Sequence, residues 1–236
     1  MKRKLLIWGA LAVTVLVLVL ICVGLYALMN SRTYQVAGRI VPRVDTEEKV
    51  VALTFDDGPT AHTPQILRAL AEAGVPATFY LIGSELAAAP AQGAAIARAG
   101  HEIGNHSYSH ERMVFVGPGT VRDEIERTDA EIAKTGYTGP ITFRPPFGKK
   151  LVALPRYLSR HDRTTVMWDV EPDSGKQASS EAIVAEAVAQ VRPGSIILLH
   201  AMYESGAASL GAIPGIITEL RARGDRFVTV SQLLTR

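Results

Sequence analysis

The chain has 236 residues, of which 47% are hydrophobic, and this is enough for one domain with a full core. Apart from three basic residues near its start, it carries 22 Lys and Arg, the total of 25 less three, against 23 Asp and Glu. The resulting net charge of −1 gives no electrostatic reason to expect nucleic acid as a partner.

Residues 1–30 are expected to form a cytoplasmic basic cap and a transmembrane signal anchor. Lys2-Arg3-Lys4 precedes an uncharged stretch from Leu5 to Met29, which is long enough to cross a bilayer. A cleaved signal peptide is the alternative, but it has a shorter apolar core and a small-residue cleavage site. We therefore expect a single-pass membrane protein with its N-terminus in the cytoplasm and the rest outside, in a periplasm or at the cell surface.

Residues 31–44 are polar with little periodicity, and we expect them to be a short tether to a folded domain at 45–236. The only cysteine, Cys22, lies in the predicted anchor. The outer domain therefore contains no disulfide and depends on its core for stability.

From residue 49 onward, strand-like and helix-like patterns alternate regularly. Seven strands are expected, at 49–55, 77–82, 102–104, 141–143, 164–168, 195–199 and 226–230. Six helices are expected between them, at 63–74, 90–100, 120–136, 151–160, 179–191 and 213–223. This alternation predicts parallel strands with right-handed crossovers.

Polar residues follow the ends of five of these strands: Asp56-Asp57, His106 with His110, Arg144, Asp169–Asp173 and His200. An open doubly wound sheet and a closed barrel both fit the alternation. An open sheet has its site at one switch point, whereas a barrel gathers its site from many strand ends. We therefore predict an α/β fold, an incomplete or distorted (β/α)7-8 barrel preceded by a single N-terminal transmembrane helix.

The adjacent carboxylates of Asp56 and Asp57 are costly to bury unless a positive partner neutralises them. His106 and His110 are four residues apart and can meet on one face of a helical turn, and neutral imidazole is a common ligand for zinc-like ions. One carboxylate and two imidazoles leave positions for water and a carbonyl, while a second carboxylate can act as general base. His200 could supply the acid for an amine leaving group. Spacing alone does not say which aspartate binds the metal.

Five motifs occur in order along the chain: TFDDGP at 54–59, HSYSH at 106–110, RPPFG at 144–148, WDVEPD at 168–173 and ILLH at 197–200. With these motifs the chain resembles the polysaccharide deacetylases with a NodB homology domain, carbohydrate esterase family 4. The resemblance extends from about Val50 to the C-terminus. One such motif would be weak evidence, whereas five in register are specific.

The resemblance implies that Asp57, His106 and His110 hold a divalent metal, with Zn²⁺ preferred and Co²⁺ as an alternative. It also implies that Asp56 is the general base. The competing interpretation of the aspartate pair is an ordinary turn, and that of the histidines is a surface pair. The presence of both motifs in one chain favours the metal site.

The resemblance further implies that Arg144 orients Asp56 and that His200 is the general acid, partnered by a carboxylate of the fourth motif. Many family members have an Asp-Trp pair there, whereas this chain has Asp173-Ser174. We assign Asp173 as the partner of His200, with Asp169 and Glu171 as competitors.

Substrate contacts are also expected from the resemblance. Leu198 would line the pocket for the acetyl methyl group. The missing tryptophan removes one aromatic wall of the usual glycan groove, and four other aromatic side chains remain as possible platforms for sugar rings. They are Trp168, Tyr108, Phe147 and Tyr203.

The sequence therefore predicts a metal-dependent hydrolase that removes N-acetyl groups from an amino-sugar glycan such as peptidoglycan, a chitin-like polymer or an exported polysaccharide. Two alternatives within the enzyme class are deacylation of a lipid-linked sugar and O-deacetylation of xylan. The alternative from another class is a catalytically silent glycan-binding module. The oligomeric state is not predicted.

Overall fold

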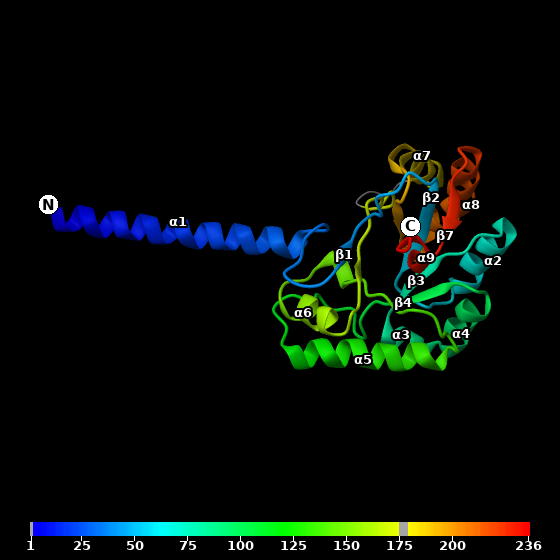
Figure 1. Ribbon diagram of the computed structural model, residues 1–236, viewed down its shortest axis with the longest axis horizontal. Helices are drawn as coiled ribbons and strands as arrows, with labels where there is room; N and C mark the ends of the chain where they lie inside the picture. The colour runs from blue at the N-terminus through cyan, green and yellow to red at the C-terminus, as the bar shows by residue number, and fades with distance from the viewer. Residues whose placement is uncertain (1, 175–178) are drawn as a thin grey trace.

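The computed structural model describes residues 2–174 and 179–236 and consists of one long helix attached to an α/β domain (Figure 1). The helix α1, Lys2–Asn30, projects away from the domain, and its described side chains as far as Ala27 are exposed. Its segment Leu6–Asn30 is long and apolar enough to cross a membrane, in agreement with the predicted anchor by length and composition.

The domain is built around a parallel sheet in which β2 lies at the centre. β2 pairs with β3, β6 and β7, and β3 pairs with β4. A separate pair is formed by β1 and β5, also in parallel. The strands are β1 Ile40–Val41, β2 Val50–Asp56, β3 Thr78–Leu81, β4 Glu102–Asn105, β5 Thr165–Val166, β6 Ile196–Leu199 and β7 Arg226–Val228.

Isolated bridges close the sheet into a distorted barrel. Phe143 bridges Asn105 at the end of β4 on one side and Thr165 of β5 on the other, and Val170 bridges Ile197 of β6. The predicted barrel is therefore confirmed. The expected strand at 141–143 is reduced to the bridges at Phe143, because the chain turns at once into the Pro145-Pro146 sequence, which cannot donate to a ladder.

Part of the predicted tether is built into the domain. Residues 40–41 pair with β5, and Val41 and Val44 are buried in the cluster beneath the sheet. The side chain of Gln35 is also buried and donates to the carbonyl oxygens of Ala37 and Arg39. This segment lacks periodicity because its contacts are made residue by residue with distant parts of the chain.

Helices cover the outside of the barrel (Figure 1). The predicted helices at 63–74 and 90–100 correspond to α2 and α4, while the short α3 and α9 are additional, and α8 begins six residues earlier than expected. The helices are α2 Thr63–Ala73, α3 Gly83–Ala88, α4 Pro90–Arg98, α5 Pro118–Lys134, α6 Ala153–Arg160, α7 Ser180–Gln190, α8 Ala207–Ala222 and α9 Val230–Leu233, with 3₁₀ turns η1 Pro146–Gly148 and η2 Glu204–Gly206.

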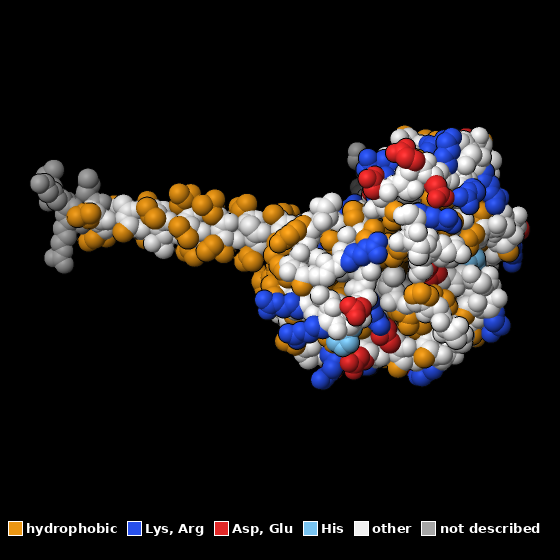
Figure 2. All heavy atoms as spheres, in the orientation of Figure 1, with side chains coloured by type: hydrophobic (Ala, Val, Ile, Leu, Met, Phe, Trp, Pro, Cys, Tyr) orange, Lys and Arg blue, Asp and Glu red, His pale blue; other side chains and the backbone are white. Residues whose placement is uncertain are grey.

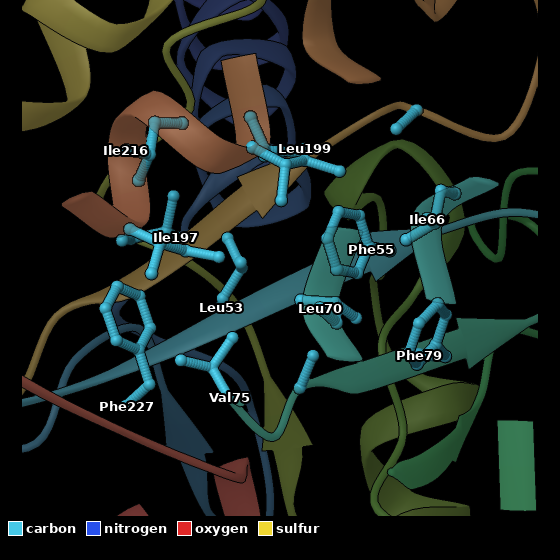
Figure 3. Close-up of a cluster of buried hydrophobic side chains, with 14 of the residues drawn as sticks. Leu53, Phe55, Ile66, Leu70, Val75, Phe79, Ile197, Leu199, Ile216 and Phe227 are labelled. Carbon is cyan, nitrogen blue, oxygen red and sulfur yellow. The ribbon is translucent and has the colours of Figure 1, made fainter. Parts of the chain in front are cut away.

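All seven residues of β2 are buried, because helices cover one face and the barrel interior covers the other. Successive side chains alternate between the faces, so Leu53 and Phe55 point toward the helix layer. Figure 3 shows both packed with Ile197 of β6 and with Leu70 of α2. Each such buried side chain contributes about 1.5–3 kcal/mol. This core fixes the strand ends that carry the polar residues.

Candidate active site

The predicted polar residues meet at the carboxyl ends of the barrel strands. Asp56 is the last residue of β2, His106 directly follows β4, Arg144 follows the bridging Phe143, and His200 directly follows β6. Together with neighbouring side chains they surround a pocket of about 310 Å³. Its lining residues are Arg32, Asp56, Asp57, His106, His110, Phe147, Trp168, Glu171 and His200.

Asp57, His106 and His110 form a cluster whose ligand atoms lie within 4.8 Å of one another. The Nε2 atom of His110 is 3.2 Å from Oδ1 of Asp57, and Nε2 of His106 is 3.8 Å from the same oxygen. This oxygen is buried and accepts no hydrogen bond from the described residues. One carboxylate and two imidazoles converging on a buried, unsatisfied oxygen fit a divalent cation.

The protonation of the cluster suits metal binding. Nδ1 of His106 lies 2.7 Å from the carbonyl oxygen of Arg144, which can only accept, so Nδ1 carries the proton and Nε2 presents its lone pair. Burial lowers the pKa of His106 to about 4 and also lowers the pKa of His110, so both rings are neutral near pH 7. Burial, followed by the charge of Asp56, raises the pKa of Asp57 to about 7. A bound cation would relieve this repulsion between carboxylates.

His106 and His110 do not lie on a helical turn, which corrects that expectation. The loop after β4 carries left-handed backbone at Ser107, with φ 65°, and at His110, with φ 58°. It is held by hydrogen bonds from the Ser107 amide to Asn105 Oδ1 and from the His110 amide to Ser107 Oγ. Asp57 has φ 73° as well, so two of the three candidate ligands have a conformation that non-glycine residues rarely adopt.

Asp56 is held by a fully buried arginine. One Nη atom of Arg144 donates to Asp56 Oδ1 at 2.6 Å and to Thr54 Oγ1 at 2.8 Å, and the other donates to the carbonyl of Met167 at 3.1 Å. The guanidinium also lies 4.1 Å from the ring centre of Tyr80. Oδ2 of Asp56 is left facing the metal cluster, 3.7 Å from Nε2 of His106.

His200 forms a second unit at the same pocket. Its Nδ1 lies 3.3 Å from Asp173 Oδ1, and its backbone amide donates to Asp173 Oδ2 at 2.6 Å. Ser209 Oγ also donates to this oxygen. Burial alone would lower the pKa of His200, but the hydrogen bond with Asp173 and the charges of Asp56, Asp173 and Asp57 outweigh it and raise the pKa to about 9. His200 is therefore a charged acid near pH 7.

The two competitors of Asp173 have other partners. Asp169 accepts hydrogen bonds from the Ser195 hydroxyl and the Ile196 amide, so it holds the start of β6. Glu171 accepts from Nε1 of Trp168 at 2.6 Å and forms an ion pair with Arg32 at 2.7 Å. Of the three carboxylates, Asp173 is the one in contact with His200.

The predicted substrate contacts divide into two groups. Trp168 and Phe147 line the pocket, and the Phe147 ring packs against His110 with centroids 4.8 Å apart and ring planes tilted by 44°. Tyr108 instead lies under the guanidinium of Arg127, and Tyr203 donates a hydrogen bond to Glu85. Leu198 is completely buried and packs in the cluster that contains Trp168, so its contact with an acetyl methyl group stays a prediction.

Arg32 and Ser209 are site residues that the sequence analysis missed. The guanidinium of Arg32 lies 4.4 Å from the Trp168 ring centre and pairs with Glu171, so the segment just after α1 forms one wall of the pocket. A signal for Arg32 was present, because an arginine at the predicted outer end of a predicted membrane helix departs from the usual charge bias. The hydroxyl of Ser209 on α8 gives no comparable signal.

Comparisons with known proteins place these observations in a family. The model of the family described as "Polysaccharide deacetylase" matches residues 43–166. The chain is 35% identical over 185 residues to a peptidoglycan-N-acetylglucosamine deacetylase of Bacillus cereus, covering 78% of this chain and 67% of the relative. The structure resembles the crystal structure of the Bc1960 peptidoglycan N-acetylglucosamine deacetylase, with a TM-score of 0.75, 34% identity and coverage of 79% and 88%.

A similar fold also occurs without turnover. The structure resembles that of BA3943, a family pseudoenzyme from Bacillus anthracis, with a TM-score of 0.71, 26% identity and coverage of 84% of this chain and 68% of the other. The fold by itself therefore does not establish activity, which depends on the side chains of the site.

Proposed function

Because the chain belongs to the polysaccharide deacetylase family, carbohydrate esterase family 4, we propose that it is a membrane-anchored enzyme that removes N-acetyl groups from amino-sugar glycans. The observation that carries the proposal is the geometry of the pocket. The Asp57, His106 and His110 cluster lies beside Asp56, which Arg144 holds, and the protonated His200 faces the same space.

The residues of this chain would divide the chemistry as follows. Members of the family use a divalent metal, which polarises the substrate carbonyl and lowers the pKa of water when bound. Asp57, His106 and His110 would hold it, and zinc fits this donor set. Asp56, held by Arg144, would accept the proton of the attacking water through the oxygen that faces the cluster.

His200 completes the reaction. Hydrolysis of an amide needs a proton on the leaving nitrogen, because a free amide anion is too basic to depart. His200 carries that proton near pH 7, and Asp173 orients the ring through Nδ1 so that Nε2 is free to donate. Phe147, which is half exposed, offers an apolar face for a sugar ring at the edge of the same pocket, whereas Trp168 is buried with Arg32 over its ring.

Peptidoglycan is the proposed substrate class, since similar proteins are named as peptidoglycan deacetylases and α1 would place the domain outside the membrane. The names of these relatives support N-acetyl rather than O-acetyl groups as the substrate, so the xylan alternative receives less support. Another relative is named chitooligosaccharide deacetylase, which keeps short oligosaccharides within the proposed class.

The test is acetate release by the full-length chain from peptidoglycan fragments, chitooligosaccharides and acetylxylan, with and without chelator. We expect release from N-acetylated glycans, loss on chelation and recovery with Zn²⁺ or Co²⁺. Glycan binding without acetate release from any substrate would contradict the proposal and favour a silent binding module. Activity confined to membrane lipid extracts would favour a lipid-linked sugar as substrate.

A further inference from the structure

Large hydrophobic side chains are exposed at few places outside α1. In the described part of the domain they are Tyr34, Val36, Phe115, Phe147, Val152 and Tyr203. Phe147 lines the catalytic pocket, and Tyr203 is bonded to Glu85 of α3. The other four lie either in the segment that follows α1 or on the domain near the end of α1. This distribution needs an explanation, because Phe115 alone is 82% exposed.

Phe115 and Val152 border an apolar groove of about 370 Å³, which we call the α6 groove. Its walls are the loop before α5 and the helix α6. Its lining residues are Val114, Phe115, Val116, Pro118, Leu151, Val152, Ala153, Arg156, Tyr157 and Arg160. The groove is separate from the catalytic pocket, with which it shares no lining residue.

The groove carries two exposed arginines at its edge. Arg156 and Arg160 are four residues apart and lie along one side of α6, and Val152 directly precedes the helix. The ion pairs of this region, Arg163 with Asp129 and Arg122 with Asp123, do not involve them. Among acidic groups, Glu126 of α5 accepts a hydrogen bond from Tyr157, and Asp162 follows Arg160 by two residues.

The α6 groove lies on the side of the domain from which α1 leaves. The amide of Lys150 contacts the carbonyl of Met29 at 3.5 Å, and Nζ of Lys150 donates to the carbonyl of Ser31. Leu151 and Val152, the next two residues, already line the groove. Figure 1 shows α6 beside the end of α1, and Figure 2 shows hydrophobic atoms and basic side chains together on this side.

The length of α1 places this side at a bilayer surface. The 25 residues of Leu6–Asn30 span roughly 37 Å, against a hydrocarbon core of about 30 Å, so Asn30 reaches the headgroup region. Because Asn30 also accepts a hydrogen bond from Lys149, no spacer separates the domain from the end of the helix. Exposed aromatic and basic groups are the side chains that favour such an interface.

From these observations we infer that the α6 groove binds anionic phospholipid of the membrane that α1 spans, as a second contact between the domain and the bilayer. Phe115 and Val152 enter the interfacial region, and Arg156 and Arg160 pair with lipid phosphates. The inference rests on the proposed membrane attachment and is independent of the proposed reaction.

The test uses the full-length chain in nanodiscs of either pure phosphatidylcholine or equal parts of phosphatidylcholine and phosphatidylglycerol. A nitroxide is attached to Phe115→Cys in a Cys22→Ser background, and its access to oxygen and to an aqueous nickel complex is compared. Ala99→Cys, exposed at the end of α4 on the far side of the domain, is the matched label. A label on the native Cys22 of the parent chain reports separately whether α1 lies in lipid.

We expect the label at 115 to be in contact with lipid in the anionic discs, while the label at 99 stays in water. Arg156→Glu with Arg160→Glu should lower the ratio of chains whose groove contacts lipid to chains whose groove is in water. The expected decrease is about fivefold or more for each arginine. Arg68→Glu with Arg98→Glu, an equal charge change on exposed arginines of α2 and α4, should leave it unchanged.

Three results would overturn the inference. The first is equal water access of the labels at 115 and 99 while the label at Cys22 is in lipid. The second is lipid contact of the label at 115 that neither pair of arginine substitutions changes. The third is exclusion of water from the label at 115 only in discs that hold two cross-linked chains. A water-exposed Cys22 would overturn the membrane attachment itself. Circular dichroism of each variant verifies the fold, and the milder Arg156→Gln with Arg160→Gln pair replaces any variant that unfolds.

Discussion

Asp56 and His200 face the same pocket, but the protein supports them in different ways. Asp56 is bonded to Arg144, which is completely buried and makes four side-chain hydrogen bonds. The side chain of His200 is 41% exposed and depends on one carboxylate, Asp173. A buried pair is costly to alter, whereas a partly exposed histidine titrates. Substitutions at Asp56 should therefore abolish nearly all activity, whereas substitutions around His200 should change activity by an amount that depends on pH.

The strongest test at Asp56 is Asp56→Asn. It keeps an acceptor for Arg144 but removes the proposed general base, so kcat for acetate release should fall by about 10²–10⁴-fold. Metal content per chain should stay normal, because Asp57, His106 and His110 are unchanged. Asp57→Asn should instead lose both metal and activity. Asp45→Asn, at an exposed carboxylate, is the matched control, and an Asp56→Asn chain without metal would refute this division of roles.

The support of His200 is tested with Asp173→Asn. His200 must be protonated to act as an acid, and its raised pKa of about 9 means that the active form is lost as the pH rises through that value. Without the Asp173 charge the pKa should fall by about 1–3 units, so the alkaline limb of kcat should move to lower pH by that amount. A pH–rate profile with an unchanged alkaline limb would argue against His200 as the acid.

The His200–Asp173 pair also makes the stability of the fold depend on pH. Because the folded-state pKa of His200 lies above its ordinary value of 6.5, its contribution to stability is complete below pH 6.5 and is lost as the pH rises through about 9. The wild-type chain should therefore lose more thermal stability between these two pH values than Asp173→Asn does. Melting curves at both pH values measure the difference.

The smallest expected effect concerns Arg32 at the pocket wall. Its ion pair with Glu171 is partly exposed, and such pairs contribute about 0–1 kcal/mol. Arg32→Gln should raise KM for a glycan by less than about fivefold and leave kcat unchanged. Arg39→Gln, an exposed arginine of the same segment outside the pocket, is the control. A large fall in kcat would instead group Arg32 with Asp56 and His200.

The sequence was sufficient for the barrel and for the residues at its strand ends. Burial on both faces makes strands such as 196–199 uniformly apolar, and parallel pairing brings their ends to one rim. The convergence of the aspartate pair with His106 and His110 could be expected for the same reason, whereas the choice of Asp57 as the ligand came from the family resemblance. Their backbone conformation could not, because φ 73° at Asp57 and 58° at His110 are imposed by tertiary contacts against local preference.

Long-range contacts of polar segments were beyond the sequence analysis. The pairing of residues 40–41 with β5 joins segments about 125 positions apart, and no hydrophobic periodicity in residues 31–44 predicted it. The Arg32–Glu171 pair joins residues 139 positions apart. Asp173, in contrast, could be chosen among three carboxylates only when the structure showed which of them contacts His200.

The packing of residues 31–44 onto the domain also determines how far the active site can reach. An unstructured linker of 14 residues could extend roughly 50 Å and would allow the pocket to reach glycan far from the membrane. The β1–β5 pair and the contacts of Lys149 and Lys150 with the end of α1 hold this segment against the domain, so it cannot extend in this way. If α1 spans the membrane as proposed, the pocket stays at a fixed, low height above the bilayer, and the glycan within its reach is the layer closest to the membrane.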